Sequence, residues 1–396
     1  MPPASQDGLR WTETLFHTVP EWTRDPSIAA IEKVCRQQLS IPPEEACNVT
    51  FHTSGIFNKL YYVDCTNRHG RPLIIRVSLP VYPGQKTRAE RMNGIPAQAR
   101  WRAMSMEQKV AFTEQMAKFQ AELSGFGKVE SLFKGIGTLD FCGISDTEDT
   151  RGVAPGLLVA HEFFMGDRLY YHLPRGPFRS SHDWLSALLN FILQQESHFL
   201  KHPKDEDERQ GAEETTYVAG KLLALVSKVC PRTMEEPEMS ALYHQDLHLD
   251  NILVNEQGEI TAVLDWECVS ALPLWMSAKL PKFLEGPTRE EEPQRDRYSD
   301  RDPKYDGSQV PYGLENNDKC DLYYEHIMEY EATQLRKVYK ARLKELWPEW
   351  PVDGHESKID LFEAISQCDG IWGGRVGKWA ERIENGDTVR FNTINP

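Results

Sequence analysis

Alternating apolar and polar positions predict short strands in the first quarter of the chain. Three segments rich in β-branched and aromatic residues carry this alternation: Val49–Thr53, Lys59–Cys65 and Leu73–Leu79. The sequence Asn67-Arg-His-Gly70 between the last two is a turn signal, and it predicts a hairpin. Residues 1–47, which precede the strands, are expected to form a helical extension with a helix beginning near Asp25 or Pro26.

Further along the chain, apolar residues recur at helical spacing. In residues 105–123, Phe112, Met116 and Phe119 fall on one stripe, which is typical of a helix packed against a core. Four other segments also predict helix: 184–200, 215–229, 322–346 and 358–384. Two segments predict strands: 135–141 and 157–164. The pattern therefore predicts an α+β protein that is β-rich at the front and helical behind.

Two charged stretches interrupt this pattern. Residues 202–214 are rich in Asp and Glu, which favours a solvated connector between two helices. Residues 285–308 are charged and Pro-rich, which favours a surface loop with little packing.

The most informative segment is YHQDLHLDNILVNEQGEITAVLDWE, residues 243–267. It predicts a loop, a short strand at Ile252–Val254, a tight turn, a second strand at Ile260–Leu264 and then Asp265. One interpretation is structural, with polar residues in a loop beside a buried hairpin. A hairpin alone does not require an Asp and an Asn five residues apart before it and another Asp after it, so we also considered chemical roles.

A zinc site is one such role. His244 and His248 lie four residues apart, as in helical zinc motifs. The predicted context is loop and strand rather than helix, however, and the glutamate of an H-E-x-x-H motif is missing.

A phosphoryl-transfer site agrees better with the order and spacing. In such sites an Asp accepts the proton of the acceptor hydroxyl, and an Asn five residues later ligates Mg²⁺. A following hairpin presents a second Asp, which connects Mg²⁺ to the phosphates. Asp246, Asn251 and Asp265 occur in this order and at this spacing, and their hard oxygen atoms suit Mg²⁺.

The motif H-x-D-L-H-x-x-N-I-L followed by V-L-D-W-E resembles the aminoglycoside phosphotransferase (APH)/choline kinase-like superfamily, in particular its fungal phosphotransferase-family members. The stretches SGIFNKLYYV, LIIRVSLP, WRAMSMEQKV, RGPF and YEATQLR extend the resemblance over nearly the whole chain. The resemblance implies a bilobal, protein kinase-like fold and ATP-dependent transfer to a small-molecule hydroxyl. It assigns Asp246 as the catalytic base and Asn251 and Asp265 as Mg²⁺ ligands.

The same resemblance assigns three residues to the nucleotide. Gly55 would lie in the turn over the phosphates, although a plain β-turn explains it equally well. Arg76 stands where protein kinases carry the strand lysine; an arginine can bind phosphate bidentately, but it is not equivalent to lysine. An exposed strand charge is the alternative for Arg76. Glu90 is the best match for the helix glutamate that pairs with that residue.

The resemblance also divides the chain into a helical extension over residues 1–47, an N-lobe over 48–100 and a helical C-lobe over 101–396. After the Arg76 strand, a kinase-like N-lobe needs a helix of about 12 residues and two strands of about five. With connections of roughly four residues, this makes about 35 residues before the hinge. Residues 77–100 supply 24, so part of the helix, two strands and the adenine-binding hinge are predicted to be missing.

An alternative assignment would restore the N-lobe. In it, helix 105–123 is the missing helix, with Glu107 or Glu114 facing Arg76. The segments 137–141 and 157–164 are then the two strands, and 162–165 is the hinge. The match of WRAMSMEQKV to the family's region behind the hinge argues against it.

Charge and composition bear on partners and location. Sixty acidic and 45 basic residues give a formal net charge of −15, which would repel phosphates, so general binding to nucleic acid or an anionic membrane is not expected. The chain has no apolar run of about 18 residues and no evident leader. Its eight cysteines include no C-x-x-C pair, which is typical of reduced thiols. A cytoplasmic protein is expected, and a resemblance to altered-inheritance-of-mitochondria proteins leaves a mitochondrial location as the alternative.

Two functions therefore stay open. The first is an ATP- and Mg-dependent phosphotransferase for a small-molecule acceptor. The second is a pseudokinase-like binding or scaffold protein that has lost productive ATP binding with part of its N-lobe.

Overall fold

The computed structural model describes the chain in thirteen stretches: residues 8–13, 18–38, 40–55, 58–65, 73–79, 88–90, 94–125, 132–142, 152–232, 236–266, 269–300, 319–348 and 354–394. Its elements are mixed helix and strand, which confirms the expected α+β class.

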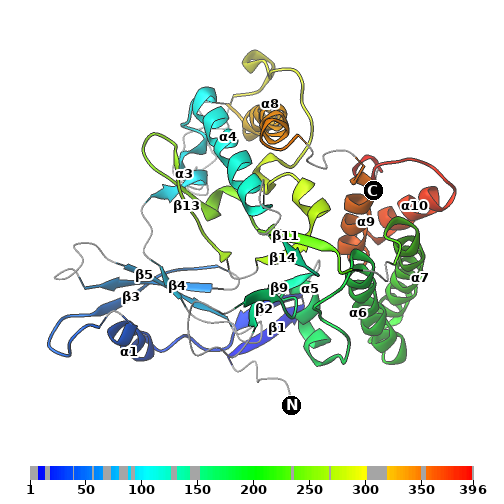
Figure 1. Ribbon diagram of the computed structural model, residues 1–396, viewed down its shortest axis with the longest axis horizontal. Helices are drawn as coiled ribbons and strands as arrows, with labels where there is room; N and C mark the ends of the chain where they lie inside the picture. The colour runs from blue at the N-terminus through cyan, green and yellow to red at the C-terminus, as the bar shows by residue number, and fades with distance from the viewer. Residues whose placement is uncertain are drawn as a thin grey trace.

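The N-lobe is an antiparallel sheet with one helix packed on it. Its strands lie in the order β3 (Asn48–Ser54), β4 (Asn58–Asp64), β5 (Leu73–Ser78) and β6 (Arg88–Glu90). The first three confirm the strands predicted from alternation. The turn predicted at residues 67–70 lies outside the described residues. Helix α1 (Ile28–Gln38) buries Ile31 and Cys35 in a small core that it shares with β4 and β5, beside the sheet in Figure 1.

A β-hairpin precedes α1. Strands β1 (Leu9–Glu13) and β2 (Thr18–Trp22) pair antiparallel, and their residues Leu9, Trp11 and Trp22 pack against the main core of the protein. The prediction of a helical extension was therefore wrong for this portion, because these apolar residues alternate and bury one face of a hairpin. The helix expected near Asp25 or Pro26 is confirmed as α1.

The C-lobe has its own five-stranded sheet. In order across the sheet, its strands are β10 (Gly152–Pro155), β9 (Gly137–Cys142), β14 (Ser270–Pro273), β11 (Met239–Tyr243) and β8 (Phe133–Lys134). Four long helices stand beside it in Figure 1 and share its core: α6 (Ser181–Lys201), α7 (Glu206–Val229), α9 (Glu356–Gln367) and α10 (Gly373–Glu384).

Two sequence predictions in this region were wrong. The apolar run at 157–164 forms no strand; it contains the short helix α5 (His161–Phe164), which buries Phe163 and Phe164. Residues 206–214 belong to α7 rather than to a connector. Asp205 caps α7 by accepting a hydrogen bond from the Glu208 N–H, and the acidic first turn suits the positive end of the helix dipole.

A third, small sheet carries the central motif. Strands β12 (Ile252–Val254) and β13 (Ile260–Val263) form the predicted hairpin, and β7 (Ile95–Pro96) pairs with the other edge of β12. Gly94 permits this close approach, because its φ is +136° and a Cβ there would lie 2.5 Å from Thr261 Oγ1. The chain therefore passes from the N-lobe sheet onto the edge of the hairpin and then into helix α3 (Ala97–Trp101).

Helix α4 (Met106–Leu123) packs against helix α8 (Asp321–Leu346) and against the hairpin, which lie together at the top of Figure 1. The Ser105 hydroxyl caps α4 by accepting from the Gln108 N–H, and the Gln108 side chain accepts from the Ser105 N–H. The assignment of α4 as an N-lobe helix was thus wrong, and so was that of β9 as an N-lobe strand, because β9 pairs with β10 and β14.

The described part of residues 80–100 contains β6, β7 and α3, and no helix precedes α3 in that part. Residues 80–87 and 91–93 lie outside it, so the missing N-lobe segment stays a prediction. Within the described stretches, none of the helices combines the length and the apolar character needed to cross a membrane.

Candidate active site

The loop between β11 and β12 holds the central motif in a fixed conformation. Leu247 and Leu249 are buried in the core formed with α4 and α8, so the alternate residues Asp246 and His248 lie on the opposite, more open side. A single 3-10 turn at Leu249–Asn251 then reverses the chain into β12. Burial of the two leucines thus orients the polar residues of the loop.

His244 is a structural residue of this loop. Its Nε2 lies 2.7 Å from the carbonyl oxygen of Leu264, and its Nδ1 accepts a hydrogen bond from the Asp246 N–H at 3.3 Å. These partners require the neutral tautomer with hydrogen on Nε2. Burial lowers the pKa of His244, which favours the same neutral form. The histidine therefore joins the loop to the far end of the hairpin.

Asp246 is the centre of a polar cluster. Its Oδ1 lies 2.5 Å from Lys282 Nζ, and its Oδ2 lies 3.3 Å from both His248 Nε2 and Asn251 Nδ2. Burial by itself raises the pKa of Asp246, but the hydrogen bond and charge of Lys282, with the two histidines, outweigh burial and lower it. The carboxyl group is therefore held ionised, as a proton acceptor must be.

Asn251 is oriented by Asp246. The Asn251 Nδ2 group donates to the backbone oxygen of Asp246 at 2.9 Å as well as to its carboxylate. Because the amide nitrogen faces Asp246, the oxygen Oδ1 is directed elsewhere, and no described residue donates a hydrogen bond to it. The Leu264 N–H donates to the Asn251 carbonyl at 2.7 Å, which brings Asn251 beside the residue that precedes Asp265.

Asp265 follows β13 in a strained conformation. Its φ is +66°, in the left-handed region that few residues other than Gly, Asn and Asp adopt. Its Oδ1 lies 2.9 Å from Arg76 Nη2, and both side chains are about three-quarters buried. Strain at a single non-glycine residue is common at functional sites, where the surrounding structure holds it in place.

Asn251 and Asp265 together suit a magnesium ion. They supply an amide oxygen and a carboxylate oxygen, the hard donors that Mg²⁺ prefers. No group of three His, Cys, Asp or Glu side chains arranged for a metal occurs among the described residues. A Mg²⁺ site does not need one, because Mg²⁺ takes its remaining ligands from water and nucleotide phosphates.

The other two predicted nucleotide residues are less informative. Gly55 lies at the end of β3, where its N–H donates to the carbonyl of Asn58, and the space around its Cα is open. It is therefore in a hairpin turn, as the alternative interpretation proposed, and residues 56–57 lie outside the described part. Glu90 is in β6 opposite Ile74, but its side chain is not described. The nucleotide roles of Gly55 and Glu90 stay predictions.

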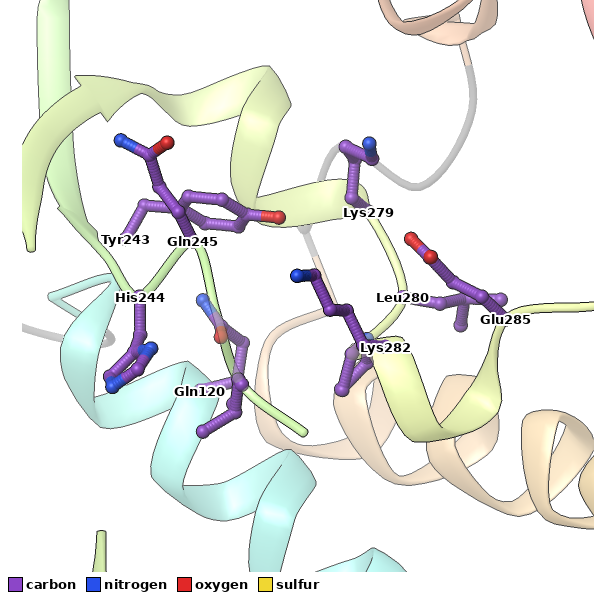
Figure 2. Close-up of a pocket in the computed structure, with 10 residues that line it drawn as sticks. Gln120, Tyr243, His244, Gln245, Lys279, Leu280, Lys282 and Glu285 are labelled. Atoms are coloured by element: carbon purple, nitrogen blue, oxygen red, sulfur yellow. The ribbon is translucent and has the colours of Figure 1, made fainter. Parts of the chain in front are cut away.

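Sequence reasoning missed a second wall of the site. A pocket of about 110 Å³ lies between residues 243–247 and residues 279–285, with Gln120 of α4 at one side. Figure 2 shows Tyr243 from β11 facing Lys279, Lys282 and Glu285 across it. Lys282 lies 36 residues from Asp246 in sequence. No motif spacing relates the two residues, and only the folded structure shows that they are in contact.

The chain is similar to proteins that are already known. A clavilactone A biosynthesis cluster protein Y from Ampulloclitocybe clavipes is 30% identical over 147 residues, which cover 33% of each chain. The match thus spans about a third of that relative's length. A crystal structure of choline kinase from Cryptosporidium parvum Iowa II aligns with 91% of this chain and 97% of its own, at 14% identity and a TM-score of 0.41, which is too weak a similarity to support an argument.

The comparison with protein families is more extensive. The phosphotransferase enzyme family (APH) matches residues 67–276, which is more than half of the chain and includes the loop, the hairpin, Arg76 and Asp265. The chain belongs to the phosphotransferase enzyme family.

Proposed function

We propose that the protein transfers the γ-phosphoryl group of ATP to a hydroxyl group of a small molecule, with Mg²⁺ as cofactor. The observation that carries the proposal is the arrangement of Asp246, Asn251 and Asp265. The ionised Asp246 carboxylate accepts a hydrogen bond from the Asn251 amide, and the Asn251 carbonyl accepts one from Leu264, the residue before Asp265. The chain belongs to a family of phosphotransferases.

In the proposed reaction the acceptor hydroxyl hydrogen-bonds to Asp246. Its oxygen bonds to the γ-phosphorus, the bond from that phosphorus to the bridging oxygen breaks, and ADP leaves. The hydroxyl proton passes to Asp246. Bound Mg²⁺ would neutralise phosphate charge, and Asn251 and Asp265 would hold it. Lys282 beside Asp246 and Arg76 beside Asp265 add positive charge to the site. This charge would stabilise the phosphoryl group in the transition state.

The test uses two variants and one control. Asp246→Ala and Asp265→Ala are each expected to abolish ADP formation from Mg·ATP, while circular dichroism shows that both variants keep the fold. The matched control is Asp300→Ala, which removes a surface carboxylate that pairs with Lys319 and should leave turnover unchanged. Full activity in Asp265→Ala would contradict the metal role.

One observation favours a second function. Arg76 already pairs with one oxygen of Asp265. The guanidinium group therefore lies at a carboxylate that is expected to bind the magnesium ion. A pseudokinase-like binding protein would keep this pair closed. Titration of the melting temperature with Mg·ATP separates the two functions: a dose-dependent rise favours the enzyme, and a flat response favours the binding protein.

A further inference from the structure

His248 belongs to the loop motif, but the proposed reaction assigns no part to it. Its Nε2 atom lies 3.3 Å from Asp246 Oδ2 and 3.2 Å from Asn251 Nδ2. About a third of its side chain is exposed, with a relative accessibility of 35%. The imidazole ring therefore lies at the edge of the site, in contact with the proposed proton acceptor and with a proposed Mg²⁺ ligand.

The loop holds His248 in place through both its backbone and its ring. The His248 N–H donates to the Asp246 carbonyl, and the His248 carbonyl accepts from the Asn251 N–H, both at 3.0 Å. On the ring, Nδ1 accepts a hydrogen bond from the Asp250 N–H at 3.2 Å and caps the 3-10 turn Leu249–Asn251. The Asp250 carboxylate lies 3.5 Å from the same nitrogen. These contacts keep the ring beside Asp246.

The same contacts decide which ring nitrogen carries a hydrogen. Because Nδ1 accepts from Asp250, the neutral ring carries its hydrogen on Nε2. A hydrogen on Nδ1 alone would meet the Asp250 N–H, and the lone pair of Nε2 would then face the Asp246 carboxylate, which repels it. A doubly protonated ring also carries a hydrogen on Nε2. In both favourable forms, therefore, Nε2 is a donor.

The acceptor within reach of this donor is Asp246 Oδ2. Asn251 Nδ2 does not compete for the hydrogen, since it is a donor itself and has the backbone oxygen and the carboxylate of Asp246 as acceptors. At 3.3 Å the contact of Nε2 with Oδ2 is long, as catalytic hydrogen bonds often are before substrate binds. The other carboxylate oxygen, Oδ1, faces Lys282 instead. The two oxygens of Asp246 thus have different surroundings.

Provided that the proposed phosphotransferase function holds, we propose that His248 is a positioning residue for Asp246. Its Nε2–H holds Oδ2 and fixes the plane of the carboxylate. The oxygen that takes the hydroxyl proton is then Oδ1, which keeps a further acceptor position beside Lys282. Correct orientation of a reacting group can account for a large part of a rate. His248 itself touches neither ATP nor the acceptor, so kcat depends on it and the KM for ATP does not.

The alternative is a merely structural role, because Nδ1 also caps the turn. Two substitutions separate the roles. The side-chain oxygen of Asn can replace Nδ1 at the Asp250 N–H, but the side chain is too short to reach Asp246 in place of Nε2. The side-chain amide of Gln can replace Nε2 as a donor, but it does not replace Nδ1. His248→Asn therefore keeps the cap, and His248→Gln keeps the contact with Asp246.

The first measurement needs no turnover. The side-chain amide of Asn251 donates to the backbone and carboxylate of Asp246, so its hydrogen exchange reports how firmly the carboxylate is held. NMR of the full chain with ¹⁵N-labelled asparagine should show about tenfold faster exchange in His248→Asn, the effect expected for the loss of one hydrogen bond to a charged group. His248→Gln should exchange as the wild type does. Unchanged exchange in His248→Asn overturns the proposal.

The second measurement is the steady-state rate of ADP formation from Mg·ATP. His248→Asn should lower kcat by about tenfold with little change in the KM for ATP, and His248→Gln should keep most of kcat. The reverse order, an active Asn variant and an impaired Gln variant, would show that His248 only caps the turn. Melting curves check that both variants fold.

The matched control is His202→Asn, which changes an exposed histidine at the C-terminal end of α6. It should alter neither the exchange of the Asn251 amide nor the rate of ADP formation. If the wild type forms no ADP while the exchange rates change as expected, the phosphotransferase function fails and the hold of His248 on Asp246 stands. If the wild type forms ADP and His248→Asn matches it in both measurements, only the positioning role fails.

Discussion

Arg76 Nη2 lies 2.9 Å from Asp265 Oδ1, and this ion pair joins strand β5 of the N-lobe to the end of the β12–β13 hairpin across 189 residues of sequence. The arginine thus contacts the carboxylate that is expected to ligate magnesium. It leaves Asp265 Oδ2 without a partner among the described side chains. Arg76 therefore competes with a metal ion for Asp265 Oδ1. A metal ion bound to Oδ2 would lie beside the guanidinium group.

Replacing Arg76 by Met should change two affinities in opposite directions. Without nucleotide, Mn²⁺, used as a paramagnetic substitute for Mg²⁺, should bind up to about fivefold more tightly, because a competing cation worth about 1 kcal/mol is removed. The KM for ATP should rise, because a phosphate-binding guanidinium is lost. Electron paramagnetic resonance of free Mn²⁺ and steady-state kinetics measure the two effects. Arg342→Met, on the surface of α8, is the control.

Replacing Lys282 by Met should lower kcat by about tenfold or more and change the KM for ATP little. The reason is that the ammonium group pairs with Asp246, the carboxylate proposed to accept the proton, where it would stabilise charge that develops only in the transition state. Lys282→Arg should restore part of kcat, which a merely structural role would not predict. Lys337→Met provides a matched surface lysine. An unchanged kcat in Lys282→Met would show that this cation plays no part.

Substitutions at Asp265 should separate backbone strain from chemistry. Asn tolerates the left-handed conformation and Val does not, so Asp265→Asn should melt near the wild type. Asp265→Val should be about 1–2 kcal/mol less stable than Asp265→Asn. Both variants should lack turnover. Urea denaturation measures the difference, and equal stability of the two variants would mean that the φ of +66° costs nothing.

Glu196 on α6 should make stability depend on pH. Burial, and next the charge of Asp369, raise its pKa from 4.5 to about 7 despite the opposing charge of Arg168. Between these two values the unfolded chain releases a proton that the folded chain retains, so stability falls as pH rises through this window. Glu196→Gln should therefore be more stable than the wild type near pH 8, by roughly 1–3 kcal/mol, and nearly equal near pH 5.

Thermal melting at the two pH values measures this effect. Glu213→Gln, on the exposed side of α7, should show no comparable difference between them. A Glu196→Gln variant that is less stable than the wild type near pH 8 would mean that the ionised carboxylate is favourable where it lies.

The β12–β13 hairpin could be predicted from the sequence because its strand and turn signals are local. Ile252–Val254 is β12 to the residue, and the turn before Gly258 closes with a hydrogen bond from its N–H to the Asn255 carbonyl. The apolar run at 157–164 was ambiguous, since periodicity does not distinguish a short buried strand from a short buried helix. The acidic run before residue 215 indicated solvent exposure correctly, but exposure does not exclude helix.

The second wall of the site had no such local signal. Lys282 and Glu285 occur in an ordinary LPKFLEG sequence, and their position depends on Arg336, more than 50 residues away, which holds the segment by its carbonyl groups. Arg76 was assigned to the site from the resemblance, with Glu90 as its expected partner, and that pairing stays a prediction. The sequence contains no pattern that shows the ion pair of Arg76 with Asp265.

The pairing of β7 with β12 has a mechanical consequence. Pro96 lies opposite Leu253 and Ile95 opposite Val254. Strand β7, which leads out of the N-lobe, is therefore paired with one edge of the β12–β13 hairpin. The ion pair of Arg76 with Asp265 connects the N-lobe sheet to the other end of the same hairpin. A shift of the N-lobe sheet would therefore act on the hairpin at two points, the edge of β12 and Asp265. Such a shift would change the distance between Asn251 and Asp265.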